Sequence, residues 1–579
     1  MADNSLKKGR FTKYSNKIGL FSNSSHGFIS QSPNVVLSFP YKDAVLEGAM
    51  SKEDVGRDER FLHYEIDKAD IDTLEDPKVL TDFKLIDKNG ESQLGANSDI
   101  EFFDENSKLK QNLLIKGNNL LALYTLREKL AGKVKLIYID PPYNTGGDGF
   151  KYNDKFKHSA WLAFMKNRLE VARELLTDDG VVFVHCDNTE QAYLKVLMDE
   201  IFGNDQFIET ISVVNNPRGR DYGGVANMHE FIHVYAKSQL DYKMYQITDL
   251  EKEFPYTDAI SPYELRELRN RNTAFNDKNR PNLCYPFYVN TANDIGEGLL
   301  EISLEPKAGY VEVLPAKSQG IQTVWRWGKT KAQENLNVHI AAKAMKEDGR
   351  FMIVEKYRKN TRLARSVWWD KDVNSEKGTV HLRELFGSRV FGFPKPETLM
   401  KRVLEIGTKE NDIVLDFCLG SGTTATTAHK MNRRWVGIEQ MDYIEEVAKE
   451  RLKKVVAGEQ GGISKAVSWQ GGGSFIYLEL KKYNQEFVDK INEAGNMGKL
   501  DEVYSDMAKN AFLKFWFDKK EFEKDENFRN LSLEERKQKL IDVLDENQLY
   551  LNYADMDDKK YHVTETEKVL TDKFYGANQ

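Results

Sequence analysis

Two short motifs carry residues whose types and spacing could do chemistry. The first is Asp140-Pro-Pro-Tyr143, and the second, far downstream, is Asp416-Phe-Cys-Leu-Gly-Ser-Gly-Thr-Thr424. Consecutive prolines fix the backbone at Pro141 and Pro142, and Pro141 also keeps the residue before it out of the helical conformation. The first motif therefore predicts a stiff elbow that holds a carboxylate and an aromatic ring against a small substrate.

An exocyclic amine on a nucleobase suits this elbow. The lone pair of adenine N6 is conjugated with the ring, so the amine is a poor nucleophile. Acceptors on its N–H groups, the Asp140 carboxylate and the Pro141 carbonyl, would draw the nitrogen toward tetrahedral geometry, while Tyr143 stacks on the base. A base in such a pocket must leave its duplex, so the motif implies base flipping. A plain Pro-Pro turn is the alternative interpretation.

The second motif is typical of a cofactor loop that follows a strand. Gly420 and Gly422 allow the backbone to turn tightly and approach a ligand, and the next helix begins with unpaired N–H groups. Glu439 ends the next predicted strand, where its carboxylate can accept hydrogen bonds from ribose hydroxyls. Position 425 is Ala, so the dinucleotide pattern G-x-G-x-x-G is not matched cleanly, and the lysine of a P-loop is absent. A nucleoside without pyrophosphate, such as S-adenosylmethionine, fits better.

The elements around these motifs alternate between strand and helix, which is typical of a doubly wound α/β fold with a mostly parallel sheet. The apolar runs predict strands at residues 113–116, 134–139, 181–185, 413–416 and 435–439, and the helical spacing of apolar residues predicts helices at about 120–130, 161–176, 190–202, 398–406, 423–432 and 441–455. Cofactor loops in such sheets lie at the carboxyl ends of strands.

Composition limits the class of protein. A chain of 579 residues is too long for one ordinary domain. No apolar run approaches the ~20 residues that span a bilayer, and the N-terminus has no apolar segment typical of a secretory signal. The cysteines, Cys186, Cys284 and Cys418, match no metal-site spacing. We therefore expect a reduced, cytoplasmic protein with no metal site and no membrane segment.

Changes in the pattern divide the chain into five parts. We predict an N-terminal extension of unknown role at residues 1–105, the catalytic half of an α/β core at 106–237, an inserted domain at 238–385, the cofactor half of the core at 386–458, and a helical C-terminal domain at 475–579. The inserted part loses the strand–helix rhythm and contains turn clusters, aromatics and arginines.

The motifs resemble those of the beta class of DNA amino-methyltransferases, and more narrowly the modification (Mod) subunit of type III restriction–modification systems. The similar segments are Leu114–Leu123, Ile137–Gly146, Tyr152–Asp154, His158–Trp161, Phe391–Pro396 and the glycine loop. The resemblance covers about residues 105–455. It fades across 240–360, where such families carry a target recognition domain, and it implies a Rossmann-like methyltransferase core.

The resemblance implies a role for each matching residue. Asp140, Pro141, Pro142 and Tyr143 would form the catalytic motif, and an aspartate at its start favours adenine N6 over cytosine N4. The residues implied to bind S-adenosylmethionine are Asn118 at its adenine, Lys395 and Pro396 at its methionine end, Glu439 at its ribose, and Asp416, Cys418, Gly420, Gly422 and Thr423 in the loop. The family has phenylalanine where this chain has Cys418. The smaller residue gives the cofactor less contact, which implies weaker binding.

Basic residues concentrate just before the glycine loop, although the whole chain has a net charge of −8. Phosphate binding needs a local basic surface rather than a basic chain. The candidate contacts to double-stranded DNA are Arg218, Arg220, Arg326, Lys329, Arg358 and Arg362. An ordinary solvated surface is the alternative interpretation of each of them.

Together these observations predict an S-adenosylmethionine-dependent DNA adenine N6-methyltransferase whose inserted domain reads the DNA sequence. The resemblance implies a homodimer and a restriction (Res) helicase–nuclease partner. This chain carries no helicase or nuclease motif, so any cleavage of DNA must come from another protein. Methylation of cytosine N4 or of RNA, a non-catalytic DNA-binding adaptor, and a nicotinamide dehydrogenase stay open as alternatives. The hypothesis requires both motifs to line one cleft.

Overall fold

The structure is a computed structural model that divides into two compact units. One unit comprises Gln246–Leu363, and the other comprises Met1–Tyr245 with Ala364–Gln579. The described residues are 21–22, 27–28, 75–145, 157–219, 224–249, 252–345, 349–514, 517–525, 528, 530–545 and 548–576. Arg220 and the segment Tyr152–Asp154 lie outside them.

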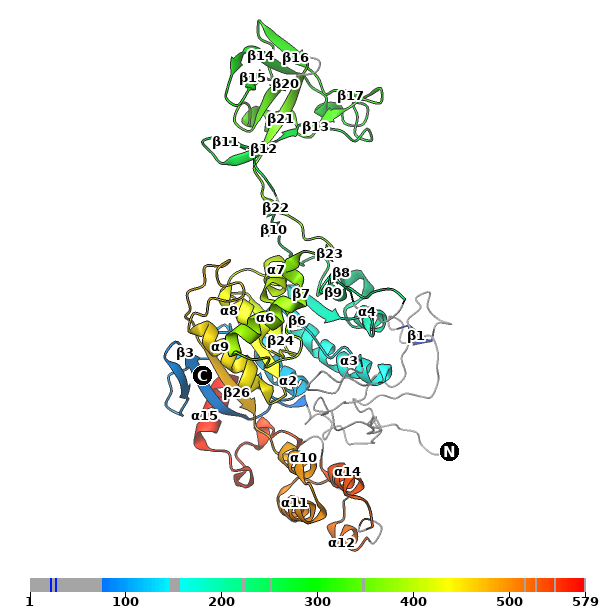
Figure 1. Cartoon of the computed structure of the whole chain (residues 1–579), viewed down its shortest axis with the longest axis vertical. Helices are drawn as coiled ribbons and strands as arrows, with labels where there is room; N and C mark the ends of the chain where they lie inside the picture. The colour runs from blue at the N-terminus through cyan, green and yellow to red at the C-terminus, as the bar shows by residue number, and fades with distance from the viewer. Residues whose placement is uncertain are drawn as a thin grey trace. The chain divides into compact units, whose positions relative to one another are not determined.

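The larger unit is built on an 11-stranded sheet of order β23-β8-β9-β7-β6-β24-β25-β5-β26-β3-β4 (Figure 1). Its centre consists of parallel neighbours, and the predicted doubly wound, mostly parallel fold is confirmed. These central strands are β7 (Leu176–Cys186), β6 (Val134–Ile139), β24 (Ile413–Asp416), β25 (Arg434–Glu439), β5 (Asn112–Lys116) and β26 (Phe475–Leu480).

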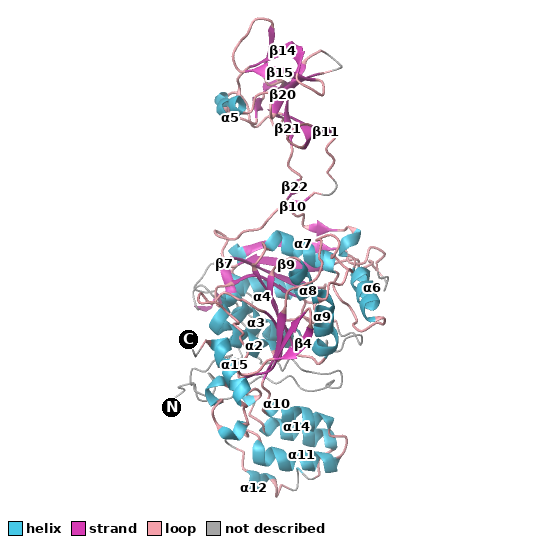
Figure 2. Ribbon diagram, turned by 90° about the vertical axis from the view of Figure 1, so that its left-hand side faces the viewer, coloured by secondary structure: helices cyan, strands magenta, loops and turns pink. Residues whose placement is uncertain are grey.

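The central strands are short apolar runs because helices cover both faces of the sheet. Every residue of β6 and β24 is buried. Right-handed crossovers place helices on opposite faces according to the direction in which the chain moves across the sheet. The helices of the core, visible around the sheet in Figure 2, are α2 (Asn119–Leu130), α3 (His158–Leu175), α4 (Gln191–Phe202), α6 (Ser375–Phe386), α7 (Glu397–Gly407), α8 (Thr423–Lys430) and α9 (Glu450–Val456).

Antiparallel strands complete both ends of the sheet. At one end β8 (Phe207–Val213) and β9 (Glu230–Ala236) pair with each other, and β9 pairs with β7. At the other end β3 (Leu80–Asp87) pairs with β26, and β4 (Gly90–Gln93) pairs with β3. The sheet therefore includes β3 and β4, which belong to the predicted N-terminal extension, and β26, which contains the first residues of the predicted C-terminal domain.

The C-terminal segment is helical after β26. Its main helices are α10 (Asn484–Glu493), α11 (Met497–Asn510), α14 (Leu533–Val543) and α15 (Glu565–Tyr575). Helix α15 packs on β3, where the Thr571 hydroxyl donates to the Leu80 carbonyl at 3.2 Å. In the part of the chain that the structure describes, no helix is long and apolar enough to cross a membrane.

The smaller unit is a β domain with its own core. Its antiparallel sheet has the order β11-β12-β21-β20-β15-β14-β16. The strands are β11 (Tyr256–Thr257), β12 (Pro262–Glu267), β21 (Phe351–Tyr357), β20 (Ile340–Ala344), β15 (Leu299–Ser303), β14 (Phe287–Asp294) and β16 (Tyr310–Val313). Buried side chains that include Phe287, Ile302 and Trp325 form the core.

This compact unit, Gln246–Leu363, spans fewer residues than the predicted insertion at 238–385. Strand β23 (Val367–Trp368) pairs with β8 in the large sheet, so the chain has already rejoined the larger unit there. Helix α6 also belongs to the larger unit. The predicted boundary at residue 385 lies beyond the end of the inserted unit at Leu363. The reason is that β23 has only two residues, so it produces no recognisable apolar run in the sequence.

Candidate active site

The two motifs meet because β6 and β24 are neighbours. They pair in parallel, with Leu136 opposite Val414 and Ile137 opposite Leu415. Parallel strands end at the same edge of a sheet, so Asp140, just after β6, and Asp416, at the end of β24, both lie there. A cavity of about 1170 Å³ opens at this edge. Ligand pockets usually measure roughly 300–1,000 Å³, so this one has room for a nucleoside cofactor and an extruded base.

Most of the predicted site residues line this cavity. They are Asp140, Pro141, Pro142, Tyr143, Arg218, Lys395, Pro396, Asp416, Cys418, Gly420, Thr423 and Glu439. Asn118 and Gly422 are not among the described lining residues. Asn118 caps α2, where its side chain accepts from the Leu120 N–H at 3.0 Å, and Asn119 lines the cavity instead. Gly422 caps α8 in the left-handed conformation, with φ of 81°.

The proline elbow is held by a hydrogen bond from α3 and by a hydrogen bond within the motif. The Trp161 indole N–H on α3 donates to the Pro142 carbonyl at 2.7 Å. The Tyr143 hydroxyl donates to Asp140 Oδ1 at 2.6 Å. The carboxylate orientation is therefore set by its own motif, and the second oxygen of Asp140 is the atom that can accept a hydrogen bond from an amine.

Lys395 joins the elbow to the other half of the core. Its ammonium nitrogen lies 2.7 Å from the Tyr143 hydroxyl, 2.8 Å from Glu230 Oε2 and 3.4 Å from Asp140 Oδ1. Burial lowers the pKa of the Lys395 ammonium, but Asp140 and Glu230 outweigh this effect and raise it above its usual value. The structure therefore places a charged lysine beside the catalytic motif.

Glu230 is a site residue that sequence reasoning missed, and it contacts His185 at the end of β7. Glu230 lines the cavity, and its Oε2 lies 3.0 Å from His185 Nε2. Burial raises the pKa of the Glu230 carboxyl, but Lys395 and His185 reverse this and hold it well below its usual range. The other ring nitrogen of His185 lies 2.8 Å from the Tyr138 hydroxyl. The available signal was a charged residue at the start of the apolar run Glu230–Ala236.

Glu439 closes the glycine loop. Its Oε2 accepts from the Gly420 N–H at 2.9 Å, and its Oε1 accepts from the Gln440 and Met441 N–H groups at 2.9 and 3.1 Å. A carboxylate has about four lone-pair sites, and Oε2, with a single backbone donor, is the oxygen better placed to accept from a ribose hydroxyl. Gly420 has φ of +54°, and an added Cβ would lie 3.3 Å from the Phe391 ring.

The surroundings of Glu439 suit a nucleoside. Phe391 and Tyr443 line the cavity with their rings 5.3 Å apart, and Met441 and Leu419 line it as well. Apolar walls with a few placed polar groups are typical of cofactor sites. The residues at this end of the cavity therefore fit a purine nucleoside held by its ribose.

The glycine loop places two residues with raised pKa values in the cavity, Asp416 and Cys418. Burial raises the pKa of Asp416 to about 7, although its Oδ1 accepts from the Cys418 N–H at 3.0 Å. Burial also raises the pKa of the Cys418 thiol well above its usual value, and the neighbouring carboxylates raise it further. A protonated thiol is a poor nucleophile, so Cys418 acts here as a packing residue.

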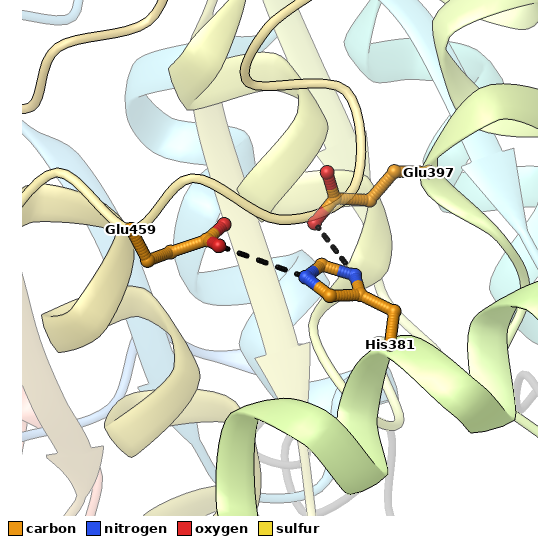
Figure 3. Close-up of side chains that lie close together, drawn as sticks. All are labelled: His381, Glu397 and Glu459. Atoms are coloured by element: carbon orange, nitrogen blue, oxygen red, sulfur yellow. Dashed lines mark ion pairs between the residues drawn. The ribbon is translucent and has the colours of Figure 1, made fainter.

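His381 and Glu397, which line the cavity, form an ionic cluster with Glu459 (Figure 3). His381 on α6, Glu397 at the start of α7 and Glu459 present possible metal-ligand atoms within 4.8 Å of one another. Lys430 already pairs with both carboxylates, at 2.9 Å from Glu397 Oε2, and Arg451 lies 3.0 Å from Glu397 Oε1. These cations balance the carboxylates, so the arrangement is an ion-pair network rather than a metal centre.

This network ties the glycine loop to α7. The Arg451 guanidinium that pairs with Glu397 also donates to the Thr423 hydroxyl at 2.8 Å. The Thr423 hydroxyl in turn donates to the Lys395 carbonyl at 3.1 Å. The cofactor loop and the backbone of Lys395 are therefore held by one set of contacts.

The candidate DNA contacts differ in their surroundings. Arg218 is exposed at the rim of the cavity, and Lys329 is exposed at the start of α5 (Lys329–Glu334). The other three described candidates pair with carboxylates of the smaller unit: Arg326 with Glu355 at 2.7 Å, Arg358 with Asp258 at 2.6 Å, and Arg362 with Asp249 at 3.4 Å.

An open α/β sheet that holds a cavity at the carboxyl ends of its strands defines a class of enzymes that bind nucleotides and related cofactors. Residues 134–450 match a family model described as DNA methylase. The chain is 34% identical to the probable type III restriction–modification enzyme HindVI Mod subunit of Haemophilus influenzae, over 98% of this chain and 88% of that protein. The chain therefore belongs to the DNA methylase family, in the group of type III Mod subunits.

Other similarities are more limited in extent. The type III EcoPI Mod subunit of Escherichia phage P1 is 33% identical over 57% of this chain and 56% of that protein. The solved M1.HpyAVI–SAM complex aligns with 59% of this chain and 98% of that chain, at 17% identity and a TM-score of 0.29. The strand order of the large sheet defines the fold of this chain.

Proposed function

We propose that this DNA methyltransferase transfers a methyl group from S-adenosylmethionine to adenine N6 in double-stranded DNA. The observation that carries the proposal is that the proline elbow and the glycine loop line one cavity. When bound, the cofactor supplies an electrophilic methyl group on a sulfonium. The nucleoside end suits Glu439 and the apolar walls near Phe391, which leaves the Asp140 end for the target base.

The chain's own residues orient and polarise the amine. Tyr143 and Lys395 both contact Oδ1 of Asp140, so Oδ2 accepts from one N–H of the target, and the Pro141 carbonyl accepts from the other. With the cofactor bound, formation of the N–C bond would break the methyl–sulfur bond and release a neutral thioether. The nitrogen would lose one proton toward Asp140, from which the proton would pass to solvent. Positioning and electrostatic polarisation supply the rate enhancement.

Product analysis tests this proposal. The chain is incubated with a donor that carries a tritiated methyl group and with duplex DNA, single-stranded DNA or RNA, and the products are digested to nucleosides. We expect label in N6-methyladenine from duplex DNA. Label in N4-methylcytosine, or label from RNA alone, would replace the adenine assignment by one of the two alternatives.

We also infer that the unit Gln246–Leu363 reads the DNA sequence, with Arg218 near the cavity rim guiding the strand. Exposed Lys329 supports a phosphate contact, whereas the ion pairs of Arg326, Arg358 and Arg362 must open for those side chains to reach DNA. Sequencing that detects modified bases, applied to DNA from cells that express the chain, gives the recognition sequence. Exchange of residues 246–363 for those of a relative should change that sequence and leave the modified base the same.

The relatives named as Mod subunits support a type III assembly. We infer a homodimer that binds a Res helicase–nuclease subunit. Light scattering after size exclusion tests the dimer. Co-expression with the Res subunit of a relative tests the complex, and a monomer that captures no Res subunit would contradict both inferences.

A further inference from the structure

Glu230 reaches the active site because of the direction of its strand. β9 runs antiparallel to β7, with Phe231 opposite Cys186. The first residue of β9 therefore lies at the edge where the parallel strands end. This places a partly buried carboxylate beside the proline elbow, although Glu230 is remote in sequence from both motifs.

The shortest contact of the Glu230 carboxylate at the active site is with the ammonium of Lys395. The Oε2 atom of Glu230 accepts from Lys395 at 2.8 Å and lies 3.4 Å from the Tyr143 hydroxyl, which donates to Asp140 at the shorter distance of 2.6 Å. The ammonium of Lys395 lies at the hydroxyl edge of the Tyr143 ring, 2.7 Å from the hydroxyl oxygen and 4.9 Å from the ring centroid. Glu230 and Asp140 thus stand on either side of one buried cation, which is nearer to Glu230.

The distances show how the cation is shared. Lys395 is 2.8 Å from Glu230 but 3.4 Å from Asp140. Without Glu230, the attraction of the ammonium would be directed to Asp140 alone, and a close ion pair there would compete with the target amine for the carboxylate. Buried charges interact strongly because little water screens them.

We propose that Glu230 is a positioning residue for methyl transfer: it holds the Lys395 ammonium on the Tyr143 hydroxyl and so leaves Asp140 directed at the amine. The inference rests on the proposed function of the same site. The other charged and titratable groups that face Lys395 are Asp140 after β6, Tyr143 in the elbow, and His185 at the end of β7. Of these, His185 contacts Glu230 directly and Lys395 only through it.

The variant Glu230→Gln tests the proposal because it keeps the shape of the side chain and removes the charge. We expect kcat to fall by about 10- to 100-fold, while KM for the methyl donor changes by less than about threefold. Loss of a carboxylate neighbour lowers the pKa of Lys395, so the alkaline limb of the kcat profile moves to lower pH. Glu230→Asp keeps the charge and should restore the position of that limb.

Glu190→Gln is the matched control. Glu190 is another carboxylate of the core, fully buried, but it contacts Asn144 and His158 and makes no described contact with Lys395. We expect the alkaline limb to stay in place in this variant. A wild-type profile in Glu230→Gln, or an equal shift in both variants, would overturn the role assigned to Glu230.

A second readout separates this inference from the proposed function. Competitive acetylation of Lys395 by acetic anhydride across pH, measured by mass spectrometry of its peptide, reports the pKa of the lysine without turnover. The midpoint should lie at lower pH in Glu230→Gln than in the wild-type chain. An unchanged midpoint overturns the inference even if methylation is observed, whereas a shifted midpoint with no methylation by the wild-type chain would count against the proposed function alone.

Discussion

The ammonium of Lys395 lies 2.7 Å from the hydroxyl of Tyr143, although 252 residues separate them in the chain. Lys395 precedes α7 in the cofactor half of the core, and Tyr143 ends the catalytic elbow. The contact follows from the insertion of β24 and β25 between β6 and β5. The two halves of the core therefore share one sheet, one cavity and one buried network of charges.

Asp140→Ala should abolish methyl transfer and retain binding. The change removes the acceptor that polarises the amine, and a lost electrostatic contact of this kind costs about 100-fold or more in kcat. Initial rates, together with affinities for the methyl donor and for DNA measured by calorimetry, check the prediction. Glu209→Ala, an exposed carboxylate on β8, is the control with unchanged rate. Full activity of Asp140→Ala would contradict the catalytic role of Asp140, whereas binding without methyl transfer by the wild-type chain would favour the adaptor interpretation.

Glu439→Gln should weaken cofactor binding. The carboxylate holds the Gly420, Gln440 and Met441 N–H groups, and charged acceptors bind such donors more strongly than neutral ones. We expect Kd for the methyl donor to rise by about tenfold, or ~1.4 kcal/mol. Calorimetric titration checks this, with exposed Glu410→Gln as the control. Equal affinities in the wild type and Glu439→Gln would exclude a role in the cofactor site.

Asp416→Asn should change how stability depends on pH. The pKa of Asp416 is about 7 in the folded chain because of burial, above its value of 3.8 in the unfolded chain. The stability that this group contributes is therefore full below pH ~4 and is lost as pH rises toward 7. The variant should gain stability relative to the wild type at pH 8 and little at pH 4.

The difference should be on the order of a few kcal/mol, since one pKa unit corresponds to about 1.4 kcal/mol. Urea unfolding of both chains at several pH values measures it. Asp178→Asn, whose side chain is 85% exposed, should show no such trend. A constant difference between wild type and Asp416→Asn across this pH range would contradict the assigned pKa.

Gly378→Ala should disturb the active site from outside. A Cβ at this position in α6 would lie 2.2 Å from the Pro394 carbonyl and 3.0 Å from that of Lys395. The backbone next to Lys395 must move, at a cost of about 1–3 kcal/mol in stability. We expect a lower melting temperature and a lower kcat, measured by calorimetry and the methylation assay.

Gly498 provides the matched helical glycine. A Cβ there would meet only the Asn496 side-chain oxygen, at 3.4 Å. Gly498→Ala in α11 should leave activity unchanged and should keep stability the same or raise it by up to about 1 kcal/mol, because Ala favours a helix over Gly. If both variants behaved alike, the contact of α6 with the Lys395 segment would have no special importance.

The sequence by itself determined the alternation of strand and helix, the elbow at Pro141 and Pro142, and the glycine loop. These features are local, because apolar runs, prolines and glycines limit the backbone wherever they occur. It also indicated that both motifs end parallel strands, since each follows a short buried run. The doubly wound fold and the shared edge of the sheet followed from those runs.

Tertiary structure alone decided which side chains complete the site. Glu230 enters through an antiparallel strand, and Asn119 rather than Asn118 lines the cavity. The sheet also takes in β3 and β26, which lie outside the predicted core because their burial depends on pairing with each other and with β5. Strand pairing and ion pairs bring together residues that are far apart in the sequence, so a local sequence pattern cannot predict these contacts.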